Sequence, residues 1–166
     1  MSVNINLPTL KEGFVSRPIS VDELEKVADL LNAYWELLIG MRKFTIDEVR
    51  GYMTLPGYDL ETSSRAVLSP DGQIIGFVVV IDLGTPPVHP VVFGCVHPDF
   101  ERQGIGTFLV HWAEERARQA VARVPDGLRV SVQFNASNTH EPTKRLFERQ
   151  GLNPIRYSLL MVADLD

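Results

Sequence analysis

The fold of this chain is decided by one stretch near its middle, which reads Val91-Val92-Phe93-Gly94-Cys95-Val96, then His97-Pro98-Asp99-Phe100-Glu101-Arg102-Gln103, then Gly104-Ile105-Gly106. The first six residues are mostly β-branched or aromatic and predict a strand, in which Gly94 marks either a bulge or a close approach of another backbone. From Gly106 to about Arg123, apolar residues recur at helical spacing. A strand, a tight turn and a glycine-rich helix start therefore follow one another directly.

The turn between this strand and this helix predicts an anion-binding site. The N–H groups of a helix's first turn have no intrahelical partner, and the helix dipole places partial positive charge there. Gly104 and Gly106 keep side chains away from those donors. A Rossmann fingerprint would need a third glycine or alanine where Leu109 stands, and a Walker loop would need Gly-Lys-Ser/Thr, which is absent. A diphosphate is the expected occupant.

The segment before this stretch predicts two helices and a hairpin. Residues 14–18 predict an edge strand that ends at a proline. Ser20 and Thr45 each begin a helix with capping-box spacing, and the second helix runs to about Met53. Residues 65–68 and 73–81 flank an Asp-Gly turn and predict two antiparallel strands. Residues 82–90 hold three prolines and predict an irregular loop.

The segment after the long helix predicts further strands and one helix. Residues 128–134 alternate as a strand, and Pro142 to Gln150 predict a helix that has proline in its first turn. Residues 155–162 predict a last strand or two. The whole order predicts an α+β fold, a central sheet with helices on both faces, in a single domain over residues 1–166.

Composition narrows the classes of protein and of site. The 166 residues carry 16 Lys and Arg against 21 Asp and Glu, a net charge of −5, which disfavours a nucleic-acid partner. The single cysteine excludes an intramolecular disulfide and a cysteine-based metal site, so we expect no metal. No apolar stretch approaches the roughly 20 residues needed to span a bilayer, and we expect a cytoplasmic protein without membrane contact.

Residues 96–106 resemble the signature of the GNAT superfamily of acyl-CoA N-acyltransferases, roughly Val-x-Pro-x-Tyr/Phe and then Gln/Arg-x-x-Gly-x-Gly/Ala. Residues 144–152 are similar to the family's final helix, and residues 156–161 are weakly similar to one half of tandem mycothiol-synthase-like proteins. The resemblance implies a mixed, mostly antiparallel central sheet. Glu101 departs from the pattern, because the family usually has Gln or Arg there.

The resemblance implies that acetyl-CoA is the cosubstrate and that a primary amine of a small molecule or protein attacks it directly in a ternary complex. Backbone amides near Cys95 and Val96 would polarise the thioester carbonyl. His140 stands where the family often has an asparagine that touches the cofactor, so Asn138 is included as an alternative. The residues expected to bind the cofactor are Cys95, Val96, Glu101, Arg102, Gln103, Gly104, Ile105, Gly106, Thr107 and Asn138.

The catalytic residues depart from the family pattern. The family often uses a glutamate of the central sheet as general base, and residues 91–96 contain no carboxylate. The base candidates are Asp82, His89, His97 and His140. Phe147 replaces the tyrosine that commonly protonates the departing thiolate, so Tyr157 or Tyr34 could substitute. The catalytic set expected from the sequence is His97, Tyr157 and Asp82.

Two main interpretations of function stay open. The first is an acetyl-CoA-dependent N-acetyltransferase. The second is a non-catalytic acyl-CoA-binding or regulatory module, motivated by Phe147 and by the missing strand carboxylate. A different nucleotide binder, such as a dinucleotide oxidoreductase, is a third reading that only the glycines support. The acceptor is undetermined, and a homodimer is compatible with the sequence.

Overall fold

The computed structural model describes residues 7–159. Its centre is a five-stranded sheet in the order β1-β2-β3-β4-β5. The strands are β1 (Val15–Arg17), β2 (Ser64–Leu68), β3 (Ile74–Ile81), β4 (Val91–Val96) and β5 (Gln133–Phe134). Each pair of neighbours is antiparallel except β4 and β5, which are parallel. The predicted α+β fold with a mixed, mostly antiparallel sheet is confirmed.

The hairpin of β2 and β3 forms as predicted around the Asp-Gly turn. Gly72 adopts a φ of 83°, and the Ser69 N–H donates to the Gln73 carbonyl at 3.0 Å. Val67 lies opposite Gly76 and Leu68 lies opposite Ile74, so the extra residue of this irregularity is Ile75 in β3. The pairing of β3 with β4 runs without a shift, and of the two alternatives for Gly94 the bulge is wrong.

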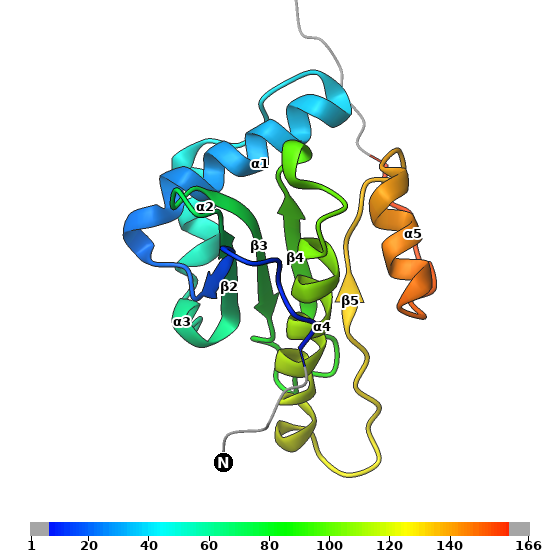
Figure 1. Ribbon diagram of the computed structural model, residues 1–166. Coiled ribbons are helices and arrows are strands. Elements are labelled where there is room, and N and C mark those ends of the chain that lie inside the picture. The colour runs from blue at the N-terminus through cyan, green and yellow to red at the C-terminus, as the bar shows by residue number, and fades with distance from the viewer. Residues whose placement is uncertain (1–6, 160–166) are drawn as a thin grey trace, which may run out of the picture.

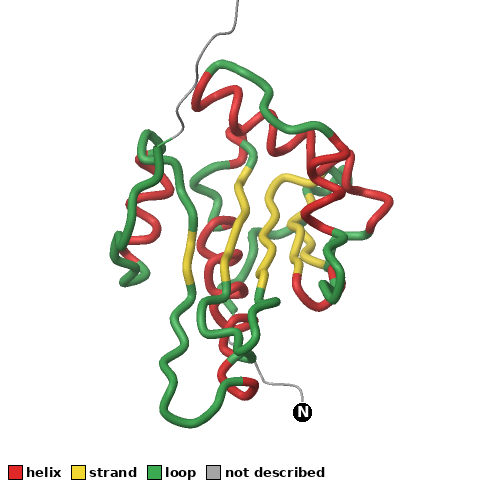
Figure 2. Tube along the Cα trace, turned by 180° about the vertical axis from the view of Figure 1, so that it is seen from behind, coloured by secondary structure: helices red, strands yellow, loops and turns green. Residues whose placement is uncertain are grey.

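One face of the sheet is covered by the N-terminal helices, η1 (Val21–Glu23), α1 (Leu24–Ile39) and α2 (Ile46–Met53), as Figure 1 shows and Figure 2 shows from behind. The capping box predicted at Thr45 is confirmed, because its Oγ1 accepts from the Glu48 N–H at 3.2 Å and its own N–H donates to the Glu48 carboxylate at 2.8 Å. Leu24, Val27 and Leu31 pack with Phe77 into the apolar core on this face. The short helix α3 (Leu60–Ser63) leads into β2.

The opposite face is covered by α4 (Ile105–Arg118), which follows the short turn η2 (Pro98–Phe100) after β4. Ile105, Phe108, Leu109 and Trp112 pack on Val78 and its neighbours in a second core. The predicted helix to about Arg123 is interrupted, since α4 ends at Arg118 and is followed by η3 (Val121–Arg123). Helices therefore lie on both faces of the sheet.

The C-terminal part departs most from the prediction. The strand predicted over 128–134 forms ladder pairs only at Gln133 and Phe134. The Ser131 N–H still donates to the Val88 carbonyl at 2.9 Å, but Pro90 has no N–H to return a bond, so the ladder does not extend to Ser131. The helix predicted from Pro142 is α5 (Glu141–Arg149), which lies beside β5 at the edge of the sheet (Figure 1). Residues 155–159 form no strand, and Ile155 and Tyr157 are exposed without a neighbouring strand; residues 160–162 of that prediction lie outside the described part.

Candidate active site

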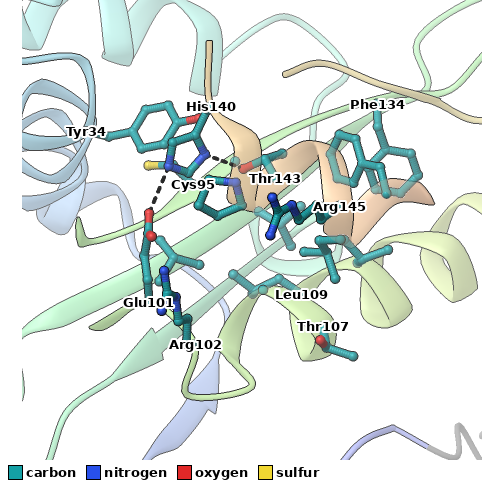
Figure 3. A pocket seen from close by; sticks show the side chains of 18 of the residues that line it. Tyr34, Cys95, Glu101, Arg102, Thr107, Leu109, Phe134, His140, Thr143 and Arg145 are labelled. Carbon is teal, nitrogen blue, oxygen red and sulfur yellow. Dashed lines mark hydrogen bonds and ion pairs between the residues drawn. The ribbon is translucent and has the colours of Figure 1, made fainter. Parts of the chain in front are cut away.

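A cleft of about 940 Å³ opens where β4 faces β5 and α5. It is lined by the backbone of β4, the turn before α4, the first turns of α4 and the inner side of α5. Figure 3 shows the side chains that approach it from these elements and from α1: Tyr34, Cys95, Glu101, Arg102, Thr107, Leu109, Phe134, His140, Thr143 and Arg145.

The cleft exists because β4 and β5 separate. Their register ends at Val92 with Phe134, and the next contact is the Asn135 N–H donating to the Val92 carbonyl at 3.3 Å. On the other side of β4, the His97 N–H donates to the Ile75 carbonyl at 2.8 Å, so alternate residues face β3. The N–H and C=O groups of Gly94 and Val96 consequently face the cleft, where β5 no longer reaches them.

Gly94 is required by the close approach of β3. A Cβ built at Gly94 would lie against the Phe77 carbonyl oxygen and 2.9 Å from the Val78 Cα. Backbone atoms cannot rotate away as side chains can, so any larger residue would push β3 and β4 apart. The alternative of a close backbone approach, predicted from the sequence, is confirmed.

The first turn of α4 presents free N–H groups to the cleft. Gly104 caps α4 with a φ of 83°, and the first intrahelical bond runs from the Phe108 N–H to the Gly104 carbonyl at 3.0 Å. The N–H groups of Ile105, Gly106 and Thr107 precede that bond and have no intrahelical acceptor. Arg102 has a φ of 58° in the same turn, and its side chain lines the cleft. This arrangement suits an anion.

The predicted cofactor-binding residues fall into two groups. Those that line the cleft are Cys95, Val96, Glu101, Arg102, Gly104, Gly106 and Thr107. The Gln103 amide oxygen instead accepts from Lys11 Nζ at 3.5 Å. Ile105, the first residue of α4, is buried in the core, and Asn138 does not line the cleft.

A polar cluster occupies one end of the cleft, beside Cys95 (Figure 3). The His140 Nε2 lies 3.0 Å from the Glu101 Oε1, and its Nδ1 lies 2.7 Å from the Thr143 Oγ1. The Tyr34 ring meets the His140 ring edge-on at a centroid distance of 5.1 Å. Burial raises the pKa of Tyr34 to about 12 and also raises the pKa of the Cys95 thiol.

The catalytic residues predicted from the sequence lie away from the cleft. His97 lines a separate, smaller hollow, and its Nδ1 accepts from the Asp99 N–H at 3.2 Å. Tyr157 is 72% exposed and does not line the cleft. The side chain of Asp82 is buried in ion pairs with Arg123 and with Arg116, the latter at 2.9 Å.

Two further residues from the sequence analysis are His89, an alternative base, and Phe147, which replaces the family's tyrosine. His89 also stands outside the cleft, with its Nδ1 2.9 Å from the Ser131 hydroxyl. Phe147 lines the cleft and packs edge-on against Phe134 at 5.3 Å, so the position of the family's tyrosine does belong to this site.

Sequence reasoning did not bring the polar cluster together. Glu101 and His140 were each noted separately as departures from the family pattern, and the structure shows that they are partners. A glutamate and a histidine can form an ion pair or a hydrogen bond, so these two departures together could have indicated a contact between Glu101 and His140. Tyr34 was named from the sequence only as an alternative proton donor, and nothing placed it beside His140, because a tyrosine on an amphipathic helix is usually a core residue. Thr143 gave no signal.

The comparisons with known proteins agree with this geometry. The sequence matches the Acetyltransferase (GNAT) family over residues 24–152. Among curated proteins, none matches it. A GCN5-related N-acetyltransferase from Sphaerobacter thermophilus shares 29% identity over 89% of this chain with a TM-score of 0.81, and this chain spans 46% of that protein.

Two more distant structures share the fold. A Salmonella typhimurium protein solved with its cofactor acetyl-CoA has a TM-score of 0.63 at 14% identity, covering 84% of this chain and 79% of that one. A diaminobutyrate acetyltransferase from Paenibacillus lautus, solved with its substrate and coenzyme A, has a TM-score of 0.58 at 19% identity, covering 82% and 74%. Within residues 7–159, no helix is both long and apolar enough to cross a membrane. With the family matched over residues 24–152 and its fold reproduced, the chain belongs to the GNAT acetyltransferase family.

Proposed function

We propose that this chain is an N-acetyltransferase that transfers the acetyl group of acetyl-CoA to a primary amine by direct attack in a ternary complex. One observation carries the proposal: the exposed edge of β4 and the free N–H groups at the start of α4 open into the same cleft. A long ligand with a diphosphate at one end and an amide-containing arm at the other matches both features. Acetyl-CoA has that form, and it supplies the activated thioester.

Groups of this chain could contact each part of acetyl-CoA, the acetyl donor. The N–H groups of Ile105, Gly106 and Thr107, with the Arg102 guanidinium, would hold the diphosphate. The outward N–H and C=O groups of Gly94 and Val96 would pair with the amide-containing arm as a neighbouring strand does. The Cys95 N–H faces β3, so the role of polarising the thioester carbonyl falls to the amides of Gly94 and Val96.

The acceptor must be a neutral amine when it attacks. An alkylammonium with a pKa of roughly 10.4 has no lone pair, so a base must accept its proton. Within the described residues, β4 carries no carboxylate for this role. His97, Tyr157 and Asp82 stay predictions from the sequence, and alanine variants of the three in the turnover assay below test them directly.

The alternative is a non-catalytic acyl-CoA-binding module. Phe147 favours it, because a phenylalanine lines the cleft where the family commonly has its proton donor. Such a module would use the same cleft and the same anion-binding turn. Binding therefore cannot separate the two functions, and turnover can.

Two measurements test the proposal in sequence. Isothermal titration with acetyl-CoA should show saturable binding, with NAD as the control nucleotide that should not compete. No binding up to millimolar acetyl-CoA would refute both functions. Release of the CoA thiol is then followed with a panel of amines: glycine, lysine, spermidine, tyramine, diaminobutyrate and a peptide with a free N-terminus. Tight binding without thiol release above background for any amine selects the binding module.

We further propose that residues 1–166 act as a single domain in the cytoplasm, with acetyl-CoA and an amine acceptor as partners. The two apolar cores share one sheet, which supports one domain. A lone cysteine suits a reducing compartment. Small-angle scattering of the full chain would distinguish a monomer from a homodimer.

A further inference from the structure

We propose that Tyr34 is the proton donor to the departing thiolate. His140, held between Glu101 and Thr143, is its positioning residue. This inference rests on the proposed acetyl transfer, and it names the group that replaces the missing tyrosine of the last helix.

A donor is needed because Phe147 has no proton to give. Phe147 lines the cleft and packs against Phe134, so this place is filled by hydrocarbon. The task then falls to another group that lines the same cleft and carries a transferable proton. Tyr34 approaches from α1, from the side of the sheet where Cys95 also points.

The other polar side chains lining the described cleft are poorly suited to this step. Arginines do not deprotonate, and ionised carboxylates accept hydrogen bonds without donating them. Cys95 is as buried as Tyr34, but burial alone acts on its thiol and raises the thiol pKa, whereas the Tyr34 phenol also has a hydrogen bond with Thr143. The alcohols of Thr107 and Thr143 are far weaker acids than a phenol. His140 has both ring nitrogens engaged, by Glu101 and by Thr143. Tyr34 is the one phenol among the described lining residues.

The surrounding contacts hold Tyr34 in one place. It is 8% exposed, and its ring meets His140 and Trp35 edge-on at 5.1 Å and 6.2 Å. His140 cannot shift freely, since the Glu101 carboxylate can only accept a hydrogen bond and therefore fixes a proton on Nε2. The cluster joins α1, the turn before α4 and the start of α5, three segments far apart in sequence.

The proton balance of the step is complete. The neutral amine nitrogen forms the new C–N bond to the carbonyl carbon, and the C–S bond breaks with its electron pair on sulfur. The phenolic O–H of Tyr34 breaks, and its proton goes to that sulfur to give the free thiol. The extra proton on the acylated nitrogen leaves to solvent, and the phenolate regains a proton from solvent before the next cycle.

The decisive experiment compares Tyr34→Phe with Tyr52→Phe, which removes the same hydroxyl from an exposed tyrosine of α2. With the best amine of the panel, Tyr34→Phe should lower kcat about 100-fold and leave the Kd for acetyl-CoA within twofold. Tyr52→Phe should leave kcat unchanged. The ratio of wild-type to Tyr34→Phe kcat should stay constant from pH 7 to about 10, because a proton donor with a pKa raised to about 12 keeps its proton throughout.

The variant His140→Ala tests the positioning role. It should lower kcat about tenfold with little change in the KM for acetyl-CoA, and His140→Gln should restore part of the loss by keeping an N–H toward Glu101. An active wild type with an equally active Tyr34→Phe overturns the inference and leaves the proposed function intact. If the ratio of wild-type to Tyr34→Phe kcat rises with pH, Tyr34 acts as a base, and this result also overturns the inference. An inactive wild type refutes the proposed function, and the inference with it.

Discussion

Replacing Gly94 by alanine tests the contact that shapes the cleft. The new methyl group would lie 2.9 Å from the Val78 Cα and closer still to the Phe77 carbonyl oxygen, where ordinary contacts begin at roughly 3.4 Å. The strands must separate by at least half an ångström, and because both opposing atoms are backbone, no rotamer change relieves the clash. Overpacking costs about 1–3 kcal/mol, and this site belongs at the upper end.

The expected loss of about 3 kcal/mol lowers Tm by about 6–12 °C for a chain of this size. Differential scanning calorimetry without ligand measures it. Gly51→Ala is the matched control, because Gly51 lies inside α2 and a Cβ there meets nothing within 4 Å. That substitution should stabilise the protein by about 0.5–1 kcal/mol, since alanine is the better helix former. A Gly94→Ala protein as stable as the wild type would refute the close approach of β3.

Three further predictions concern charge and ligand. Arg116→Met leaves the buried Asp82 carboxylate with only the half-exposed Arg123 and should cost about 3 kcal/mol in urea unfolding; a loss under 1 kcal/mol would contradict a stabilising role. Arg17 lowers the pKa of Glu23 below its ordinary 4.5, so this pair stabilises the fold above about pH 4.5, and the contribution disappears as pH falls through the lowered pKa. Glu23→Gln should therefore make Tm fall less steeply as the pH is lowered. An unchanged acid limb of the Tm-against-pH curve would count against the pair. Acetyl-CoA at 100 times its Kd should raise Tm by about 5–11 °C, from a binding contribution of about 2.7 kcal/mol, and the absence of a shift would argue against the cleft as its site.

Features encoded by neighbouring residues were predictable. The Asp-Gly turn forms the hairpin, Thr45 caps its helix, and Gly104 ends the anion-binding turn, because each signal and its consequence lie within a few residues. The family resemblance rested on such a local run, and it identified seven of the residues that line the cleft.

Features that depend on distant partners were not predictable in the same way. The alternation of residues 128–134 indicates a strand, but Pro90 on the neighbouring segment has no N–H to complete the ladder, so β5 has two residues. Asp82 is chemically a fair base, but Arg116 lies 34 residues further along the chain and binds it in an ion pair. Tyr34 and His140 are separated by more than a hundred residues, and no local pattern indicates that their rings touch.

The brevity of β5 has a consequence for how the molecule moves. One wall of the cleft is attached to the sheet by two ladder pairs and a few flanking backbone hydrogen bonds, whereas β3 and β4 share six ladder pairs. Local opening of this wall should therefore require much less free energy than global unfolding, and its amides should exchange with solvent early. A ligand that pairs with β4 while packing against α5 would bridge the two sides and slow that opening. In the proposed acetyl transfer, the rate at which product leaves would then depend on the same weak attachment, and the shortest strand of the described sheet would influence the turnover rate.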